Sequence, residues 1–395
     1  MPYIFLLSLC LLILNACATS QQQPQSKGRP VVIHAARLFD GYRFKTNVSV
    51  LIENDKIVRV DKRSALADQP ATMIDLGDAT ILPGFIELHA HLGYRHVPAE
   101  TVLRHGITTV RDVGGPVHQP YGGSGSLRVL TSGPIITASG GYPIPSLGAT
   151  DIAIPVATAE EARRTVRDLV QKGAVVIKVA LEPGLEQGAP WHSAHHHERP
   201  PHHANAHNPW PLLSEAIVEA IVDEAHHLDR RTSAHIGERR GAEIAVNAGI
   251  DEWAHIPCAQ IPVPLLESAV TRHTTFVTTM DTLSRCRGVV SNIRHLAAAG
   301  AHFLYGAEIG HPDIPWGIDA NELLMMKHLT GRQMLEILQS ATSRAGSYLG
   351  IPLLGTVQAG APADLIAVSG NPVDNLKALE YPLFVMSGGK TVLRP

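Results

Sequence analysis

The chain has 395 residues, of which 45% are hydrophobic and 17% are charged, and its formal net charge is −3. This length and apolar content fit two domains, or one α/β barrel of about 250 residues with an additional domain. The small negative charge excludes the strongly basic surface that binds nucleic acid, so we expect no nucleic-acid partner. Histidine is the outlier in the composition, with 22 residues.

The N-terminal segment has the pattern of an export signal. Pro2 to Leu14 form a largely apolar run that is too short to span a bilayer but suits the core of a signal peptide. The following Leu14-Asn15-Ala16-Cys17 resembles a bacterial lipobox, in which the cysteine carries the lipid. We therefore expect residues 1–17 to be a signal peptide with a lipobox-like end and residues 18–30 to be a polar linker. A plain cleaved signal or a short anchor is the alternative.

This N-terminal pattern also predicts where the protein is found. We expect it to be extracytoplasmic, on the periplasmic side of a bacterial membrane. Its contact with the membrane would be only through a lipid anchor at Cys17.

Short alternating segments rich in β-branched residues follow the linker. Val48–Ile52 and Lys56–Val60 flank the polar triplet Glu53-Asn54-Asp55, a pattern that predicts a β-hairpin. The C-terminal part of the chain has the same alternating, β-branched pattern in residues 364–368, 382–386 and 390–393. We therefore predict that residues 31–80 and 355–395 together form a small β-sandwich domain.

The central block, residues 81–354, alternates short apolar runs with helical stretches, which predicts βα units and a parallel sheet. Eight strands are expected in succession, the number in a TIM (β/α)8 barrel, where chemistry is carried at the carboxyl ends of the strands. The expected strands are Phe85–Leu88, Thr108–Asp112, Ile135–Ala138, Val175–Val179, Thr232–His235, Glu252–His255, Thr275–Thr279 and His302–Tyr305, and the amphipathic helical segments are Ala159–Lys172, Ser214–Leu228, Gly241–Ala248 and Val290–Ala299.

The strongest chemical signal is Leu82-Pro-Gly-Phe-Ile-Glu-Leu-His-Ala-His91. His89 and His91 are two residues apart at the end of a strand, so their side chains project to the same face. Two imidazoles in this arrangement can bind one cation at about 2 Å from each nitrogen. A bare His-x-His is common, but here it ends the first predicted barrel strand.

Further residues of the metal-binding type fall at the ends of later strands. Lys178 lies in an otherwise apolar strand, where an unpaired lysine is costly. His235 and His255 end two successive strands, and Glu308 follows the eighth. Each histidine alone is more often a buried core residue, and Glu308 alone would be a solvated loop carboxylate. Their common position at strand ends favours a metal site.

With these motifs, the sequence resembles the amidohydrolase superfamily, especially its imidazolonepropionase-like and bacterial prolidase-like branches. Gly106-Ile-Thr-Thr-Val-Arg-Asp-Val-Gly114 and Gly360-Ala-Pro-Ala-Asp-Leu-Ile-Ala-Val368 also match, and the resemblance covers about residues 31–395. It implies that His89 and His91 bind one metal and that His235 and His255 bind a second. Lys178 would be a carboxylated lysine that bridges the two metals.

The resemblance also implies the function of a metal-dependent amidohydrolase. One or two divalent metal ions, most simply Zn²⁺, would activate water to cleave an amide bond of a peptide, an N-acyl amino acid or a cyclic amide. Glu308 stands where the family has an aspartate that touches the metal and transfers the proton. The additional methylene would displace the carboxylate by roughly 1.5 Å.

Two other functions stay open at this stage. One is a lactone or ester hydrolase that uses the same site. The other is a periplasmic metal-binding lipoprotein with little or no catalysis, which Glu308 and the histidine-rich stretch Trp191–Trp210 would favour. A purely structural barrel would leave these metal-type residues without a role. The individual substrate and any homo-oligomer also stay open.

Cysteine usage indicates no disulfide framework. Besides Cys10 and Cys17, only Cys258 and Cys286 are present. These two could form a disulfide in an oxidising compartment or be small buried residues, and the sequence does not decide between the two.

Overall fold

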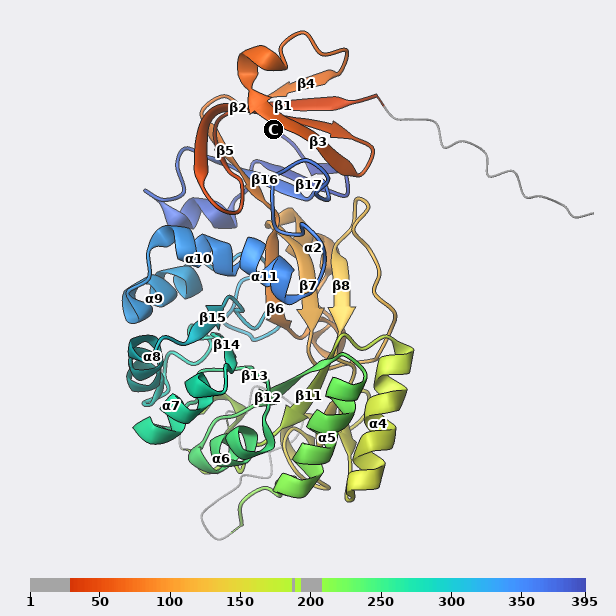
Figure 1. Cartoon of the computed structure of the whole chain (residues 1–395), viewed down its shortest axis with the longest axis vertical. Helices are drawn as coiled ribbons and strands as arrows, with labels where there is room; N and C mark the ends of the chain where they lie inside the picture. The colour runs from red at the N-terminus through yellow and green to blue at the C-terminus, as the bar shows by residue number, and fades with distance from the viewer. Residues whose placement is uncertain (1–28, 187–188, 193–207) are drawn as a thin grey trace, which may run out of the picture.

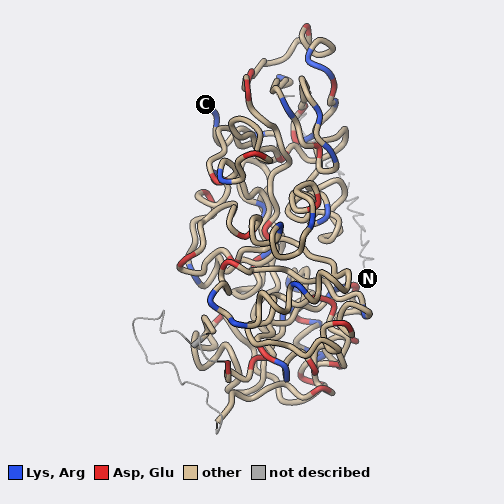
Figure 2. Tube along the Cα trace, turned by 90° about the vertical axis from the view of Figure 1, so that its left-hand side faces the viewer, with Lys and Arg blue, Asp and Glu red and all other residues tan. Residues whose placement is uncertain are grey.

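The computed structural model describes residues 29–186, 189–192 and 208–395. The predicted signal peptide, the lipobox cysteine, most of the linker and most of the histidine-rich stretch lie outside these residues. None of the helices that are described is both long and apolar enough to cross a membrane. Acidic and basic residues are interspersed along the trace (Figure 2).

Strands from the two sides of the central block form one sheet of eight strands. Its order is β18-β17-β16-β5-β1-β2-β3, with β4 paired to β1. The predicted hairpin is present as β2 and β3, with Asn54 in the left-handed conformation at φ 56° in the turn. The eight strands belong to one connected sheet, so the two-layered sandwich stays a prediction. The strands are β1 (Val31–Phe39), β2 (Phe44–Glu53), β3 (Lys56–Lys62), β4 (Thr72–Asp75), β5 (Ala79–Pro83), β16 (Leu365–Ser369), β17 (Phe384–Ser387) and β18 (Lys390–Leu393).

The sheet joins segments that are far apart in sequence. β5 pairs antiparallel with β16, with Leu82 opposite Ile366. Figure 1 shows β1 to β5 at one end of the molecule, beside β16 and β17. A separate apolar cluster that includes Ile33, Val50 and Leu365 fills this part of the fold. The two groups of strands therefore stabilise each other through a common core.

The central block is an α/β structure with parallel strands, as predicted, but its strands form two sheets, so closure into one eight-stranded barrel stays a prediction. A three-stranded sheet has the order β6-β7-β8, and a seven-stranded sheet has the order β10-β9-β11-β12-β13-β14-β15. Its strands are β6 (Phe85–Ala90), β7 (Ile107–Asp112), β8 (Arg128–Thr131), β9 (Ile135–Thr137), β10 (Ala153–Pro155), β11 (Val176–Ala180), β12 (Arg231–His235), β13 (Glu252–Trp253), β14 (Thr275–Val277) and β15 (His302–Leu304). The expected strands are all present, and β8 and β10 were not predicted.

The two parallel sheets contact each other at two places. Val175 N donates to Thr131 O over 2.9 Å, and His91 N donates to Ile309 O over 2.7 Å. A parallel bridge also joins Ala90 to Ile309. These contacts bring the residues that follow β6 beside those that follow β15.

Helices follow the strands and line the outside of the central block (Figure 1). The predicted α4 is observed with the expected bounds, because Thr158 accepts a hydrogen bond from Glu161 N at its start and Gly173, at φ 115°, ends it. The helices are α1 (Leu92–Arg95), α2 (Ala99–Arg104), α3 (Ile144–Leu147), α4 (Ala159–Lys172), α5 (Glu215–His227), α6 (Arg239–Ala248), α7 (Val263–Thr271), α8 (Val289–Ala298), α9 (Ala320–Thr330), α10 (Met334–Ser340) and α11 (Ser343–Tyr348), with short 3-10 helices at Arg63–Ala65, Pro190–His192 and Leu376–Glu380.

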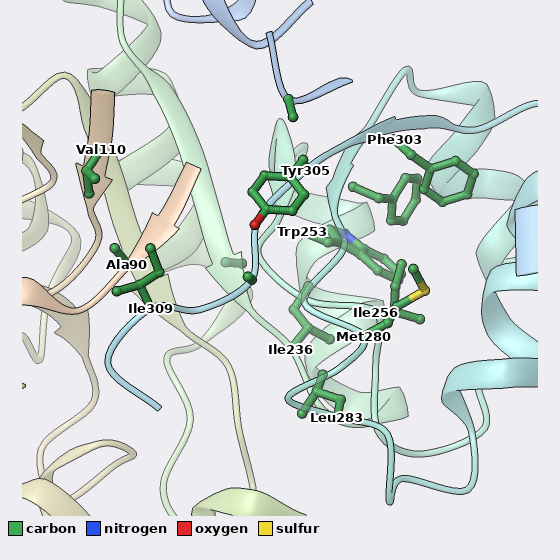
Figure 3. Close-up of a cluster of buried hydrophobic side chains, with 14 of the residues drawn as sticks. Ala90, Val110, Ile236, Trp253, Ile256, Met280, Leu283, Phe303, Tyr305 and Ile309 are labelled. Atoms are coloured by element: carbon green, nitrogen blue, oxygen red, sulfur yellow. The ribbon is translucent and has the colours of Figure 1, made fainter. Parts of the chain in front are cut away.

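The main apolar core lies between these helices and the parallel strands. Trp253 and Phe276 pack edge to face with ring centroids 5.3 Å apart. Ile256 and Met280 belong to the same core (Figure 3). Cys258 and Cys286, which the sequence left undecided, form a disulfide between the segments after β13 and before α8.

Candidate metal centre

His89 and His91 lie at the carboxyl end of β6, and both side chains are buried. Their ring centroids are 5.0 Å apart. The alternation of side chains along a strand directs both rings to the same side, as the spacing predicted. His91 lies immediately before α1, so it marks the point at which the strand becomes a short helix.

Two histidines from neighbouring strands complete a cluster of four rings. His235 ends β12 and His255 lies two residues beyond β13. The centroid of His255 is 4.7 Å from that of His235 and 4.5 Å from that of His89. The structure therefore brings together the four histidines that the sequence singled out.

Glu308 reaches this cluster from the segment after β15. Its Oε1 is 3.4 Å from His91 Nε2 and its Oε2 is 3.9 Å from His255 Nδ1. Ligand atoms of His89, His255 and Glu308 all lie within 4.8 Å of one another. Atoms that each bind a cation at about 2 Å must lie within this range.

Lys178 is in the middle of β11 and is 1% exposed. Burial lowers the pKa of this lysine to about 7, against the opposing effect of the Glu252 carboxylate. Burial and the charge of Lys178 also hold the pKa of His89 and of His235 well below the ordinary value. These imidazoles are thus neutral at pH 7, the state in which histidine binds metals.

Several buried nitrogens of the cluster have no hydrogen-bond partner among the described residues. They are both ring nitrogens of His89, Nε2 of His235 and Nζ of Lys178. Buried polar atoms without a partner are rare in folded proteins, and an ion that is not part of the chain is one reason for them. Neutral imidazoles next to a carboxylate are the donor set of a divalent cation such as zinc. The residues present therefore fit such a metal.

A layer of polar contacts beneath the cluster fixes the strands that carry it. Glu87 accepts hydrogen bonds from His89 N at 2.7 Å and Ala307 N at 2.9 Å, which connects β6 to the segment after β15. Arg111 donates twice to the Glu252 carboxylate, at 2.6 and 2.9 Å, across the buried interior. Burial raises the pKa of Glu87 to about 8.

One hydrogen bond orients a histidine of the cluster, because His255 Nδ1 is 2.8 Å from Thr279 Oγ1. The buried Glu182 Oε2 lies 3.7 Å from His235 Nε2, which is too far for a hydrogen bond. Thr279, Glu182, Glu87 and the pair of Arg111 and Glu252 were not predicted from the sequence. A charged residue within an otherwise apolar strand is a sequence signal that could have identified such positions. Glu87, Arg111 and Glu252 each provide this signal. Thr279 and Glu182 lie in loops and give no such signal.

A cavity opens beside the cluster and is partly open to solvent. His91 and Glu308 line it, as do His311, Arg95 and the aromatic side chains Tyr94, Tyr142 and Trp191. Tyr142 and Trp191 also contact the His235 ring, with centroids 4.5 and 4.7 Å away. A bound molecule would thus contact the candidate centre and an aromatic wall together.

The sequence matches one family model and one group of curated relatives. The model of the amidohydrolase family matches residues 80–392. Ochratoxinase of Aspergillus niger is 28% identical over 258 residues, which are 60% of this chain and 50% of the relative. The chain thus spans about half the length of the curated relatives it matches.

Solved structures share the fold over most of this chain. The structure of A. niger ochratoxinase has a TM-score of 0.73 at 20% identity, covering 93% of this chain and 96% of that one. The structure of a Xaa-Pro dipeptidase with bound methionine in the active site has a TM-score of 0.74 at 22% identity, covering 92% and 99%. At these identities the similarity shows a common fold.

Proposed function

The chain belongs to the amidohydrolase family, and we propose that it hydrolyses a carbon–nitrogen bond of a small molecule or peptide by using metal-activated water. The observation that supports this most is the convergence of His89, His255 and Glu308, each from a different strand end. The ochratoxinase relative and the dipeptidase of similar fold support an amide as the bond that is cleaved.

The ligands would divide between two divalent cations, with zinc the best match to the donors. His89 and His91 would hold one, together with Glu308, and His235 and His255 would hold the other. Bound cations would supply Lewis acidity, which polarises the substrate carbonyl and lowers the pKa of water to about 7. Because His255 Nδ1 is hydrogen-bonded to Thr279, the other ring nitrogen, Nε2, would be the one left to hold a cation.

Lys178 would bridge the cations as a carbamate. Its neutral amine attacks carbon dioxide, an N–C bond forms, one C–O π bond opens, and one proton leaves to solvent, which converts the neutral amine into an anionic carbamate. The burial of Lys178 and its pKa of about 7 favour the neutral amine that this reaction needs. A carbamate would also explain why a lysine is tolerated in this apolar strand.

Glu308 would transfer the proton. Its carboxylate accepts a proton from the attacking water as the new C–O bond forms, and it delivers this proton to the leaving nitrogen as the C–N bond breaks. Glu308 lines the cavity and lies next to His91 and His255, so it can reach both a metal ligand and a substrate.

We also propose that the central block closes into a barrel and that the protein is exported to the periplasm. The contacts between the edges of the two parallel sheets, at Ala90 with Ile309 and at Val175 with Thr131, support closure into a (β/α)8 barrel. The Cys258–Cys286 disulfide suits an oxidising compartment and so supports export to the periplasm. The lipid anchor at Cys17 rests on the sequence motif alone.

One observation favours a second candidate, a metal-binding protein with little catalysis. Glu308 is in the left-handed conformation, at φ 68°, which is uncommon for residues other than glycine. If this backbone holds the carboxylate away from the attacking water, metal would bind and turnover would be poor. An ester or lactone hydrolase would use the same residues as the amidohydrolase.

The test combines metal content with turnover. We expect two equivalents of divalent metal in the wild type by mass spectrometry, a sharp fall in Lys178→Ala, and little change in Glu308→Gln. On amide substrates, Glu308→Gln should lose about 10²- to 10⁴-fold in kcat. Metal binding without hydrolysis of any amide or ester would support the non-catalytic candidate, and unchanged metal in Lys178→Ala would contradict the bridging role.

A further inference from the structure

Another cavity lies at the amino end of β15 and shares no lining residue with the cavity beside the metal centre. His302 and Phe303, at the start of β15, line one side, and residues of α9, α10 and α11 line the other. Figure 1 shows α9 and α10 next to each other. The cavity is partly open to solvent and has a volume of about 220 Å³. Glu308 follows the carboxyl end of β15, so the two cavities lie at opposite ends of this strand.

Two arginines bring positive charge to this cavity. Arg332 and Arg344 line it together with His302, and Glu336 is the one carboxylate among the lining residues. Arg332 lies in the turn between α9 and α10, where Gly331, at φ 69°, ends α9. Two guanidiniums against one carboxylate leave an excess of one positive charge.

Glu336 does not neutralise both arginines. Its Oε1 is 3.2 Å from Arg332 Nη1 and 3.8 Å from Arg344 Nη2, and its Oε2 accepts a hydrogen bond from Gln333 N at 3.2 Å. The distance to Arg344 is too long for a hydrogen bond. Within the described part of the chain, the Arg344 guanidinium forms no hydrogen bond and has this ion pair alone. Its N–H donors are therefore available to an anion from solution.

The remaining walls of the cavity are apolar. Phe303, Met326 and Ile337 are buried members of the main core. Arg332 Nη2 donates to Ala301 O over 3.3 Å, so its guanidinium is fixed between the start of β15 and α10. A guanidinium that is already fixed in this way loses little freedom when an anion binds.

His302 is affected by the positive charge of this cavity. Partial burial and the charges of Arg344 and Arg332 lower the pKa of the His302 imidazole below its ordinary value. An anion bound at the two guanidiniums would have the opposite effect and raise this pKa. The imidazole is therefore a probe of what the cavity holds.

We propose that Arg332 and Arg344 bind a small oxyanion in this cavity, with a phosphate group as the best match. Phosphate accepts several charged hydrogen bonds at once, and a guanidinium presents its donors in the planar fork that fits it. The ligand is inorganic phosphate or a small phosphomonoester, since the cavity has room for more than the bare ion. A bound phosphate would connect α11 to the turn before α10. This site does not depend on the proposed hydrolysis, which belongs to the other end of β15.

Calorimetry with sodium phosphate at constant ionic strength tests the proposal on the full-length, metal-loaded protein. We expect saturable binding to the wild type and a loss of about 10- to 100-fold in affinity in Arg344→Gln, the effect of one charged hydrogen bond. Glu336→Gln should change the affinity in the opposite direction, by about 2- to 5-fold, because it removes the carboxylate that competes for the arginines. The glutamine keeps an oxygen that can accept from Gln333 N.

A measurement at the cavity itself separates this site from phosphate that binds to the metal centre. NMR titration of the imidazole signals gives the pKa of His302, whose signal is assigned by its loss in His302→Gln. We expect phosphate to raise this pKa in the wild type and to leave it unchanged in Arg344→Gln. Arg164→Gln is the matched control, since Arg164 is an exposed arginine of α4 that also lies against one glutamate oxygen, at 3.4 Å. It should behave as the wild type in both measurements.

Glycerol 3-phosphate distinguishes the two sources of the phosphate group. Tighter binding than that of inorganic phosphate, again weakened in Arg344→Gln, would assign a phosphomonoester, and equal or weaker binding would assign the free ion. The proposal is overturned if the wild type shows no saturable phosphate binding, if Arg344→Gln binds phosphate as tightly as the wild type, or if the pKa of His302 does not respond to phosphate. None of these results depends on whether the protein hydrolyses an amide.

Discussion

Glu308 shows how a side chain that is one methylene longer than the family's aspartate fits the site. The sequence predicts a displacement of its carboxylate by roughly 1.5 Å. In the structure the residue has a left-handed backbone, at φ 68°, and its carboxylate lies 3.4 Å from His91 and 3.9 Å from His255. The glutamate carboxylate therefore lies beside both histidines in this backbone conformation.

Thr279 is a second residue whose backbone is unusual. It is β-branched and has a φ of 44°, a conformation that is rare for such residues. Its amide donates to Gly306 O over 2.8 Å, and its hydroxyl bonds His255 Nδ1. Unusual backbone geometry of this kind persists where the surroundings hold it in place, often at functional sites.

We predict that Thr279→Val lowers the metal affinity about 10- to 100-fold, because valine keeps the shape but loses the hydroxyl that orients His255. Thr279→Ser keeps the hydroxyl and should retain an affinity close to that of the wild type. A competition titration with a fluorescent chelator measures both. Equal affinities of the two variants would show that the contact with His255 does not matter for metal binding.

The site could be predicted in part from single residues. His89, His91, Lys178, His235, His255 and Glu308 all follow or occupy predicted strands, and parallel strands gather their carboxyl ends at one edge. Thr279 ends a predicted strand, but a threonine at that position gives no signal of its role, and Glu182 and Arg95 lie in a loop and in a short helix. The position of such residues depends on the path of the chain through the whole fold, which local periodicity does not describe.

At the scale of secondary structure, long periodic segments were predicted best. α4 has the predicted bounds because it combines an apolar face with a Thr158 cap and a terminal Gly173. β8 and β10 were not predicted, and they have only four and three residues. The equally short β9, β14 and β15 were predicted because each lies within a longer apolar or β-branched run of the sequence.

The Cys258–Cys286 disulfide joins two of these elements. It links Cys258, in the segment after β13, to Cys286, in the segment before α8, and the two cysteines are 28 positions apart in sequence. Both cysteines are buried, and Gly288 N also donates to Cys258 O over 2.8 Å. The bridge therefore encloses β14 and Thr279 in one closed loop.

We predict that replacing both cysteines by serine lowers the free energy of unfolding by about 3–4 kcal/mol, because the loop of the unfolded chain is no longer constrained. Denaturant titration at fixed metal concentration measures this change. Dithiothreitol should lower the stability of the wild type by a similar amount and leave the double variant unaffected. No difference between oxidised and reduced wild type would contradict the prediction.

At the scale of the whole molecule, the eight-stranded sheet shares the main apolar core with the parallel strands, through residues such as Leu82 and Ile366, and polar contacts join them as well. Asp364 is central among these polar contacts. Its carboxylate accepts from Arg128 at 3.0 Å and from Gly388 N at 2.7 Å, and its own carbonyl accepts from Gly84 N at 2.9 Å. Asp364 thus connects β8, β16 and the turn before β18.

We predict that Asp364→Ala destabilises the protein by about 2–4 kcal/mol, because Arg128 loses its anion and a buried amide loses its acceptor. Asp364→Asn keeps one acceptor and should cost less. Denaturant unfolding followed by both fluorescence and circular dichroism provides the measurement. If the Asp364→Ala variant is as stable as the wild type, the contacts of Asp364 do not hold the eight-stranded sheet and the parallel sheets together.

The division into a β domain at residues 31–80 and 355–395 and a barrel at 81–354 stays a prediction, although the strands of the first sheet fall close to those ranges. β5 extends to Pro83 and continues almost directly into β6. The alternating pattern of both chain ends was visible in the sequence. Only this shared alternating pattern suggested that the two chain ends pair in one sheet. The strand partners themselves depend on long-range contacts, which a local pattern does not show.

The pairing of β5 with β16 has a consequence for biosynthesis. β1 to β5 emerge from the ribosome first, but their partner strands β16 to β18 are made only after the entire central block. Until then, β5 presents an unpaired edge whose apolar side chains include Ile81 and Leu82. Exposed edges of this kind attract other chains, so the nascent protein would depend on chaperones until its last strands arrive.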